Sequence, residues 1–348
     1  MRKKPTTLKD IANELGVSIS TVSRALRDSH EVGEGVKKQV RELAAALDYH
    51  PNPLALGLLR RRSFTIGIVV PSIGYYYNHS AISGIEQVLN LRGYSAMICQ
   101  SQESGELEAL HVRNLVSSQV DGIIASIAES SDDTAHFQYA REKGIPIVFF
   151  DRAPEFPQAS RVVIDNREAA RNAVQHLLNA GCRRLVYFAG PAGLRISNTR
   201  YEGLCQALEA SGSGVALRRT VHCPIHQEAA YSAMDALLGD GIDFDGVFAV
   251  NDRVAMGLLS ALIHRGLRVP HDVAVIGFND EPYCNYLQPG LSSVAQPSQE
   301  MGAAAARLLL QHLDNEEESP SPIVQIFETR LVVRESTGSK TGIGSLVH

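Results

Sequence analysis

The sequence predicts an α/β protein in which a small all-α helix-turn-helix head precedes a two-lobed core of parallel sheets flanked by helices. Three observations support this prediction. Residues 7–26 contain two short helical patterns separated by a three-residue break. From residue 64 onward, short apolar runs alternate with amphipathic helical patterns, as is typical of parallel strands connected by helices. This alternation occurs in two sets, which indicates two lobes.

The first helix of the head has recognisable ends. Thr7 is placed to be its N-cap, and Asp10 occupies the capping-box position three residues later. Gly16 is a C-cap candidate, because glycine adopts the left-handed conformation that often ends a helix. The residues expected on its apolar face are Leu8, Ile11, Ala12 and Leu15.

The second helix is expected to begin after Ser18 and is too short to be stable without packing on the first. Its inward face would consist of Val22, Ala25 and Leu26. Its outward face would carry Ile19, Ser20, Thr21, Ser23 and Arg24. A row of hydroxyl groups and one arginine is the chemistry of a recognition helix in the DNA major groove. The alternative is an ordinary helical hairpin with a solvated face.

A third helix, expected over about 34–47, would close a three-helix core. Beyond it, Asn52 and Pro53 can begin a short apolar helix over 54–59, which is followed by the three arginines 60–62. A helix of two turns would be largely unfolded alone in water. We therefore expect this segment to become ordered only against a partner helix and a nucleic-acid backbone.

Charge is distributed unevenly along the chain. Residues 1–62 hold 12 Lys and Arg against 7 Asp and Glu, whereas the remaining residues hold 21 against 31. A basic head on an acidic body is typical of a DNA-binding module joined to a small-molecule receptor. The five cysteines include no C-x-x-C pair, so we expect reduced thiols. Because no signal-peptide or membrane-spanning pattern is found, we expect a cytoplasmic protein with no membrane association.

The alternating patterns place the elements of the core. Strands of the first lobe are expected at Thr65–Val70, Tyr94–Cys99, Gly122–Ile127, Pro146–Phe150 and Arg161–Ile164. Strands of the second lobe are expected at Arg184–Ala189, Ala216–Cys223, Gly246–Val250 and Val273–Phe278. The helices that matter most below are expected at Ser80–Arg92, Asn198–Ser211, Arg253–Arg265 and Ser298–Leu313.

Signatures of enzymes built on parallel sheets are missing from the sequence. Residues 189–193 read A-G-P-A-G, and Pro191 does not fit the glycine-rich turn of dinucleotide-binding enzymes. No G-x-S-x-G nucleophile motif occurs, and the 12 histidines show no metal-ligand spacing. We therefore expect no enzymatic activity, no cofactor and no metal site.

Several motifs occur in a characteristic order. These are T-L-K-D-I-A, L-G-V-S, T-V-S-R-A-L, Y-H-P-N-P-L-A, I-G-I-V-V-P, F-F-D-R, R-Y-E-G, V-N-D, G-F-N-D and Q-P-S-Q-E-M-G. In this order the chain resembles the lac/gal repressor family of bacterial transcriptional regulators, from Thr6 to about Glu335. The motif of the head is highly specific. The motifs of the core are weaker individually, but their order and spacing are characteristic.

The resemblance implies a division of the chain. Residues 1–50 would be the DNA-binding head, 51–62 a hinge helix, 63–338 an effector-binding core similar to periplasmic binding proteins, and 339–348 a flexible tail. Lobe one would comprise about 63–164 and 294–322, and lobe two about 165–293 and 323–338. Residues Val324–Val333 are thus expected in lobe two. The Gly- and Ser-rich tail has no leucine heptads, so a dimer is expected without a C-terminal coiled coil.

The resemblance also assigns DNA contacts. Ile19, Ser20 and Arg24 would meet base edges, and Thr21 and Ser23 would contact phosphates. The hinge would contribute Asn52, Ala55 and Leu58. Leu58 matches a leucine that is wedged into the minor groove at a flexible base step. The alternative is that residues 54–59 are only a buried linker.

Effector contacts are implied where strands end, because ligands of two-lobed α/β proteins bind at the carboxyl ends of the strands. The candidates are Ser72, Tyr76, Tyr77, Ser126, Asp151, Asn198, Arg200, Asn251, Asn279, Asp280 and Gln296. The alternative for each strand-end Asp or Asn is a turn or capping residue, and Asp252 suits capping equally well. The chain departs from the family pattern at Leu56 and Gly57 of the hinge, where polar residues or arginine are frequent, and at two positions of the core. Ile225 replaces a frequent stacking aromatic, and Asn279 stands where aspartate is common.

These observations predict a transcriptional regulator, a repressor, that acts as a homodimer on near-palindromic double-stranded operator DNA. Its operator affinity would be controlled by a sugar or a sugar phosphate bound between the lobes. Two alternatives stay open. The chain could be a sugar-binding protein of the periplasmic type without a regulatory role, or a regulator controlled by a non-sugar metabolite or a protein partner.

Overall fold

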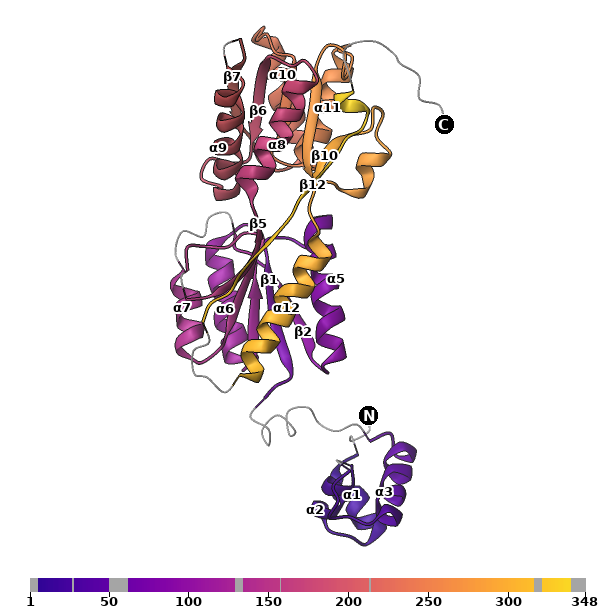
Figure 1. Cartoon of the computed structure of the whole chain (residues 1–348). Coiled ribbons are helices and arrows are strands. Elements are labelled where there is room, and N and C mark those ends of the chain that lie inside the picture. The colour runs from indigo at the N-terminus through magenta and orange to yellow at the C-terminus, as the bar shows by residue number, and fades with distance from the viewer. Residues whose placement is uncertain are drawn as a thin grey trace. The chain divides into compact units, whose positions relative to one another are not determined.

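The computed structural model describes residues 6–26, 28–49, 62–128, 134–156, 158–212, 214–315 and 321–338. The chain divides into two compact units, Met1–Ser63 and Phe64–His348 (Figure 1). The hinge residues Asn52, Ala55 and Leu58 and the tail 339–348 lie outside the described residues.

The head contains helices α1 (Leu8–Leu15), α2 (Ile19–Leu26) and α3 (Glu34–Ala46). Thr7 and Asp10 form the expected capping box, since the Thr7 backbone N–H donates to the Asp10 carboxylate at 2.8 Å. Gly16 ends α1 at φ 65°. The fully buried residues Ile11, Val22, Ala25 and Val40 come from all three helices, so the three helices share one small core.

Lobe one is a six-stranded parallel sheet with the order β11-β5-β4-β3-β1-β2. Its strands are β1 (Thr65–Val70), β2 (Ser95–Gln100), β3 (Gly122–Ala125), β4 (Ile147–Phe150), β5 (Ser160–Ile164) and β11 (Val324–Phe327). Its helices are α5 (Tyr76–Leu91), α6 (Gly105–Ser117), α7 (Ala135–Glu142) and α12 (Ser298–Asp314). The inner strands are buried on both faces, which is why they read as continuous apolar runs.

Lobe two is also six-stranded, with the order β12-β10-β9-β8-β6-β7. Its strands are β6 (Arg184–Ala189), β7 (Ala216–His222), β8 (Gly246–Ala249), β9 (Ala274–Asn279), β10 (Ser292–Ala295) and β12 (Arg330–Val332). Its helices are α8 (Asn166–Asn179), α9 (Arg195–Ala210), α10 (Gln227–Gly239) and α11 (Asp252–His264), with short 3₁₀ turns at Pro282–Asn285 and Glu335–Thr337. All neighbouring strands are parallel except β12, which runs antiparallel to β10.

The expectation that Val324–Val333 returns to lobe two is wrong for its first half. Strand β11 adds to the lobe-one sheet beside β5, with Ile326 opposite Val163, and only β12 pairs in lobe two. Strand β10 also lies in lobe two, although the expected boundary falls within it at residue 294. A short strand can complete the free edge of either sheet, so the apolar pattern alone does not say which sheet it joins.

The start of α5 differs from the sequence expectation in a way that matters for the pocket. The helix begins at Tyr76 rather than near Ser80, after an extended Tyr75. Aromatic residues have modest helix propensity, so the sequence does not mark this turn as helical. Tertiary packing stabilises it, because Tyr77 is buried and its hydroxyl donates to the Met301 sulfur on α12 at 3.6 Å. Helix α9 likewise begins at Arg195, one turn early.

Helices α5 and α12 lie side by side in lobe one (Figure 1). Their close approach depends on two glycines. A Cβ atom on Gly84 would lie 2.0 Å from the Gln299 carbonyl oxygen, and one on Gly302 would lie 2.0 Å from that of Ala81. The backbones therefore touch at this crossing, which fixes the helix that carries Tyr75 and Tyr77 into the pocket.

Candidate functional site

The recognition face of α2 points to solvent, as the sequence predicts. Ile19 is 49% exposed, Ser20 and Arg24 are exposed, and Thr21 and Ser23 are half-buried. The Ser18 hydroxyl accepts from the Thr21 backbone N–H at 3.0 Å, so Ser18 caps the helix. The outward side chains of α2 are therefore accessible to a binding partner without any rearrangement of the head.

Arg24 is oriented by a neighbour outside α2. Its Nε lies 3.1 Å from the Glu31 carboxylate, and both side chains are largely exposed. An ion pair through Nε leaves the outer edge of the guanidinium available for a bidentate contact. Glu31 was missed by sequence reasoning because it lies beyond the end of the helix, in a segment without a motif.

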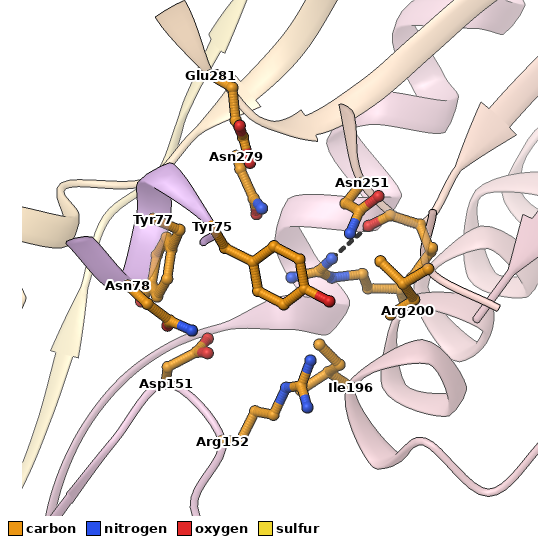
Figure 2. Close-up of a pocket in the computed structure, with 12 residues that line it drawn as sticks. Tyr75, Tyr77, Asn78, Asp151, Arg152, Ile196, Arg200, Asn251, Asn279 and Glu281 are labelled. Atoms are coloured by element: carbon orange, nitrogen blue, oxygen red, sulfur yellow. Dashed lines mark hydrogen bonds between the residues drawn. The ribbon is translucent and has the colours of Figure 1, made fainter. Parts of the chain in front are cut away.

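In the core, a pocket is lined by residues of both lobes (Figure 2). Lobe one contributes Tyr75, Tyr77, Asn78, Asp151 and Arg152. Lobe two contributes Ile196, Arg200, Ile225, Val250, Asn251, Asn279 and Glu281. Of the predicted effector residues, the structure brings together Tyr77, Asp151, Arg200, Asn251 and Asn279.

Asp151 and Asn279 occupy corresponding places in the two lobes. Asp151 directly follows β4, Asn279 ends β9, and both have positive φ values, 57° and 112°. Aspartate and asparagine tolerate this region better than other non-glycine residues, but it remains strained. Backbone strain at two facing strand ends is typical of residues that are held in position to bind a ligand.

Arg200 is the largest fully buried side chain of the chain's described part, at 2% exposure. Its Nε donates to the Asn166 side chain at 2.9 Å, its Nη1 donates to the Val250 carbonyl oxygen, and its guanidinium stacks on Phe278 at 3.5 Å. Burial lowers the pKa of Arg200 to about 10, so it stays cationic at neutral pH. Only two of its five N–H donors are used in these bonds, which leaves donors for a ligand.

Each lobe provides one acidic side chain to the pocket, Asp151 from lobe one and Glu281 from lobe two. Burial raises the pKa of Asp151, whose carboxylate accepts from the Ser126 hydroxyl at 3.5 Å. Arg152 lies beside it and pairs with Glu103 at 2.7 Å. An acceptor from one lobe thus faces donors from the other, an arrangement that suits pairs of hydroxyl groups.

Tyr75 lies toward the middle of the group of labelled residues (Figure 2). The guanidinium of Arg253, at the start of α11, stacks on the Tyr75 ring at 4.7 Å, and its Nη2 donates to the Gly74 carbonyl oxygen at 3.5 Å. These contacts join the two lobes beside the pocket, which Tyr75 lines. Burial raises the pKa of Tyr75.

The other predicted residues do not line this pocket. Gln296 supports it, since its Nε2 donates to the Asn279 side chain at 2.8 Å. Asp280 instead pairs with Arg334 at 2.8 Å, and Tyr76 is 47% exposed. Ser72 accepts from Asn78 through its carbonyl oxygen at 2.7 Å. Ser126 acts only through Asp151, as above, and Asn198 is exposed on α9.

Sequence reasoning left Asn78, Ile196 and Glu281 out of the site. Asn78 and Ile196 lie in first helical turns that the sequence does not mark as helical, so no strand end pointed to them. Glu281 directly follows two predicted residues, and that adjacency was the available signal. Asn251 both caps α11, accepting from the Val254 N–H at 2.9 Å, and faces the pocket.

Among the described ranges, no group of three or more His, Cys, Asp or Glu side chains is arranged to hold a metal ion. A search of the same ranges found no helix with the length and apolar character needed to cross a membrane.

The head has an exposed polar recognition helix, and the two lobes of the core enclose a polar pocket. Together these two features define a ligand-responsive DNA-binding regulator. Comparisons with known proteins agree. Residues 7–52 match bacterial regulatory proteins of the lacI family, and residues 174–337 match the periplasmic binding protein-like domain. The ribose operon repressor of Halalkalibacterium halodurans is 31% identical over 335 residues, which cover 95% of this chain and 97% of that protein.

Solved structures show the same architecture. The lac repressor dimer bound to operator and an anti-inducer superimposes with a TM-score of 0.86 at 24% identity, covering 96% of this chain and 99% of that chain. A complex of the transcriptional regulator CelR with cellobiose is 30% identical with a TM-score of 0.71, covering 95% and 99%. The chain belongs to the lacI family of bacterial regulatory proteins.

Proposed function

We propose that the protein is a sequence-specific transcriptional repressor whose operator affinity is controlled by a sugar or sugar derivative bound between the lobes. One observation carries the effector half of this proposal. Asp151 from lobe one faces Arg200 and Asn279 from lobe two around a single pocket. A ligand that bonds to both sides is bound more tightly when the lobes are closed on it, so binding is coupled to lobe closure.

The chemistry of the pocket favours a polyhydroxylated ligand. The lining holds two carboxylates, three amides and two guanidinium groups, which can bond to several hydroxyl groups at once, and Tyr75 and Tyr77 offer apolar faces. One relative is named a ribose operon repressor, and the regulator CelR has been solved in complex with cellobiose; ribose and cellobiose are both sugars. Ile225 in the lining provides no aromatic plane for a purine-like ring.

For the DNA half, we propose that Ile19, Ser20 and Arg24 read base edges while Thr21 and Ser23 contact phosphates. Two heads on a near-palindromic operator are needed, because one head makes too small an interface for genomic specificity. We propose a homodimer in which the hinge, 51–62, connects the head, 1–50, to the core, 63–338. In that hinge Asn52, Ala55 and Leu58 would meet the minor groove. The protein would act in the cytoplasm and catalyse no reaction.

The test begins with selection of binding sites from random duplex DNA, followed by footprinting on the selected site. Arg24→Ala should lose about 1–3 kcal/mol of preference at one base pair. Lys38→Ala, on the exposed face of α3, is the matched control for loss of one positive charge. It should lower affinity without changing the preferred sequence. Unchanged preference in Arg24→Ala would show that the recognition assignment is wrong.

The effector half is tested by titrating sugars into the protein–operator complex. At least one sugar should change operator affinity in the wild type. A protein that binds sugars but no specific duplex would instead be a binding protein without a regulatory role. Control by purines or a protein partner alone would refute the sugar assignment.

A further inference from the structure

A second cavity adjoins the effector pocket. The two share Asp151, Arg152 and Ile196 in their walls, so they are neighbouring compartments of one cleft. We call the second cavity the outer compartment. The residues that line it include Arg161, Val163, Arg167, Arg195, Val324 and Ile326. Because Arg195 belongs to lobe two and the strand residues to lobe one, this compartment is also built by both lobes.

The edge of the lobe-one sheet gives the outer compartment an apolar wall. Val324 and Ile326 on β11 are 48% and 66% exposed, and Ile326 pairs in register with Val163 on β5. Side chains two residues apart on a strand point to the same face. Exposed aliphatic side chains that line a cleft offer a surface for the apolar part of a ligand.

Arginines border this wall. Four arginines line the outer compartment, namely Arg152, Arg161, Arg167 and Arg195, against two aspartates, Asp151 and Asp165. Three of the arginines have carboxylate partners, since Arg152 pairs with Glu103, Arg167 with Glu202 and Arg195 with Glu155. Arg161 forms no ion pair within the described part of the chain.

The ion pair of Arg195 is the most exposed of the three and the one that joins the two lobes. The Arg195–Glu155 pair joins the lobes at 2.7 Å, with side chains 54% and 83% exposed. Exposed ion pairs contribute little to stability, so a ligand anion can replace Glu155 at small cost. Arg161 and Arg195 thus form a pair of available cations from opposite lobes.

We infer that the effector is an acidic saccharide, whose hydroxylated ring occupies the inner pocket while its carboxylate or phosphate reaches Arg161 and Arg195 in the outer compartment. This inference rests on the proposed function, because it assumes that a sugar binds the inner pocket. A guanidinium binds a carboxylate or a phosphate through paired N–H donors, so the two arginines could bind either group in the same way. The anion would also bridge the lobes, which adds to the coupling between binding and closure.

The test is calorimetric titration of the full chain with matched sets of sugars. One set is glucose, glucuronate and glucose 6-phosphate, and the other is galactose, galacturonate and galactose 6-phosphate. At least one acid should bind about tenfold or more tightly than its neutral parent. Which acid binds more tightly distinguishes a carboxylate ligand from a phosphate ligand.

Substitutions test whether the preference for an acidic sugar depends on the outer compartment. Arg161→Gln should remove most of the advantage of the acid while leaving the neutral parent unchanged, and Arg161→Lys should keep part of it. Arg171→Gln is the matched control, because Arg171 is an exposed α8 arginine paired with Glu168 and is not among the lining residues. Thermal unfolding of each variant shows that it is folded.

Two outcomes overturn the inference. In one, no acid in either set binds more tightly than its neutral parent. In the other, Arg161→Gln keeps the full preference. Footprinting separates this failure from failure of the proposed function. A protein that binds a selected operator but shows no acid preference loses only this inference, whereas one that binds no specific DNA loses the proposed function as well.

Discussion

The head and the core place their functional residues in opposite environments. In the head, Arg24 and Ser20 lie on the exposed face of a single helix, and the core of the head is built from other side chains. In the core unit, Arg200 on α9 and Asp151 at the end of β4 come from different lobes, and Arg200 is buried while Asp151 is half-buried.

This difference indicates which substitutions can change function without changing the fold. Exposed residues on one helix contribute little to folding, so their substitution should alter binding alone. Buried polar residues need their partners to remain satisfied, so substitution there affects both the pocket and the surrounding packing. The following predictions test this contrast.

The largest effect is expected for Arg200→Gln. The side chain would lose the fixed guanidinium that faces the pocket, and sugar affinity should fall at least about 100-fold, or roughly 3 kcal/mol. Calorimetry on the full chain measures this. Arg200→Lys should not restore affinity, because an ammonium cannot reproduce the stacking on Phe278 together with the bonds to Asn166 and Val250. Full restoration by lysine would mean that only charge matters.

Helix packing should show the next largest effect. Gly84→Ala places a methyl group 2.0 Å from a backbone oxygen, so the core should lose about 2 kcal/mol of unfolding free energy. Denaturant unfolding measures it. Gly239→Ala in α10 has no atom within 4 Å and is the matched control. In the head, Gly35→Ala also has open space and should stabilise α3 by up to about 1 kcal/mol.

The pH dependence of the core should depend on Asp252. Its carboxylate accepts from the Ser293 hydroxyl at 2.6 Å and the Glu281 N–H at 2.8 Å, yet burial raises its pKa from 3.8 to about 7. Between these values the folded chain binds more protons than the unfolded chain, so the contribution of this group to stability falls as pH rises. Asp252→Asn should therefore reduce the loss of stability between pH 5 and 7 by about 1–2 kcal/mol.

Unfolding midpoints measured at both pH values give this difference. Asp235→Asn is the control, because the exposed Asp235 pairs with Arg265 and has a lowered pKa. A group of that kind titrates below this pH window, so the control should retain the wild-type slope. Identical slopes in Asp252→Asn and the wild type would contradict the prediction.

The smallest effect is expected for Glu31→Gln in the head. Loss of an exposed ion pair should change the stability of the head by less than about 1 kcal/mol. Arg24 would lose its fixed orientation, and the head would lose a negative charge. Affinity for random DNA should therefore rise while the ratio of specific to random binding falls. Fluorescence anisotropy with both duplexes measures this ratio. A large loss of stability would show that head function and fold are not separable.

The head and the type of core could be predicted from the amino-acid sequence. Caps, spacing and the Ser/Thr/Arg row of α2 are properties of neighbouring residues, and the structure agrees with them at Thr7, Gly16 and Ser18. The alternation of strands and helices predicted two parallel sheets because burial on both faces leaves a clear apolar pattern. Strand ends also pointed to Asp151, Asn251 and Asn279.

Which strand joins which sheet, and which side chains meet in the pocket, depends on tertiary packing and could not be predicted from the sequence. Strand β11 joined lobe one, where its exposed side chains line the outer compartment. Asp280 and Asn279 are adjacent in sequence, yet Asp280 pairs with Arg334 and only Asn279 lines the pocket. The direction of a side chain after a strand depends on one or two backbone dihedrals and on partners distant in sequence. Local pattern contains no information about either.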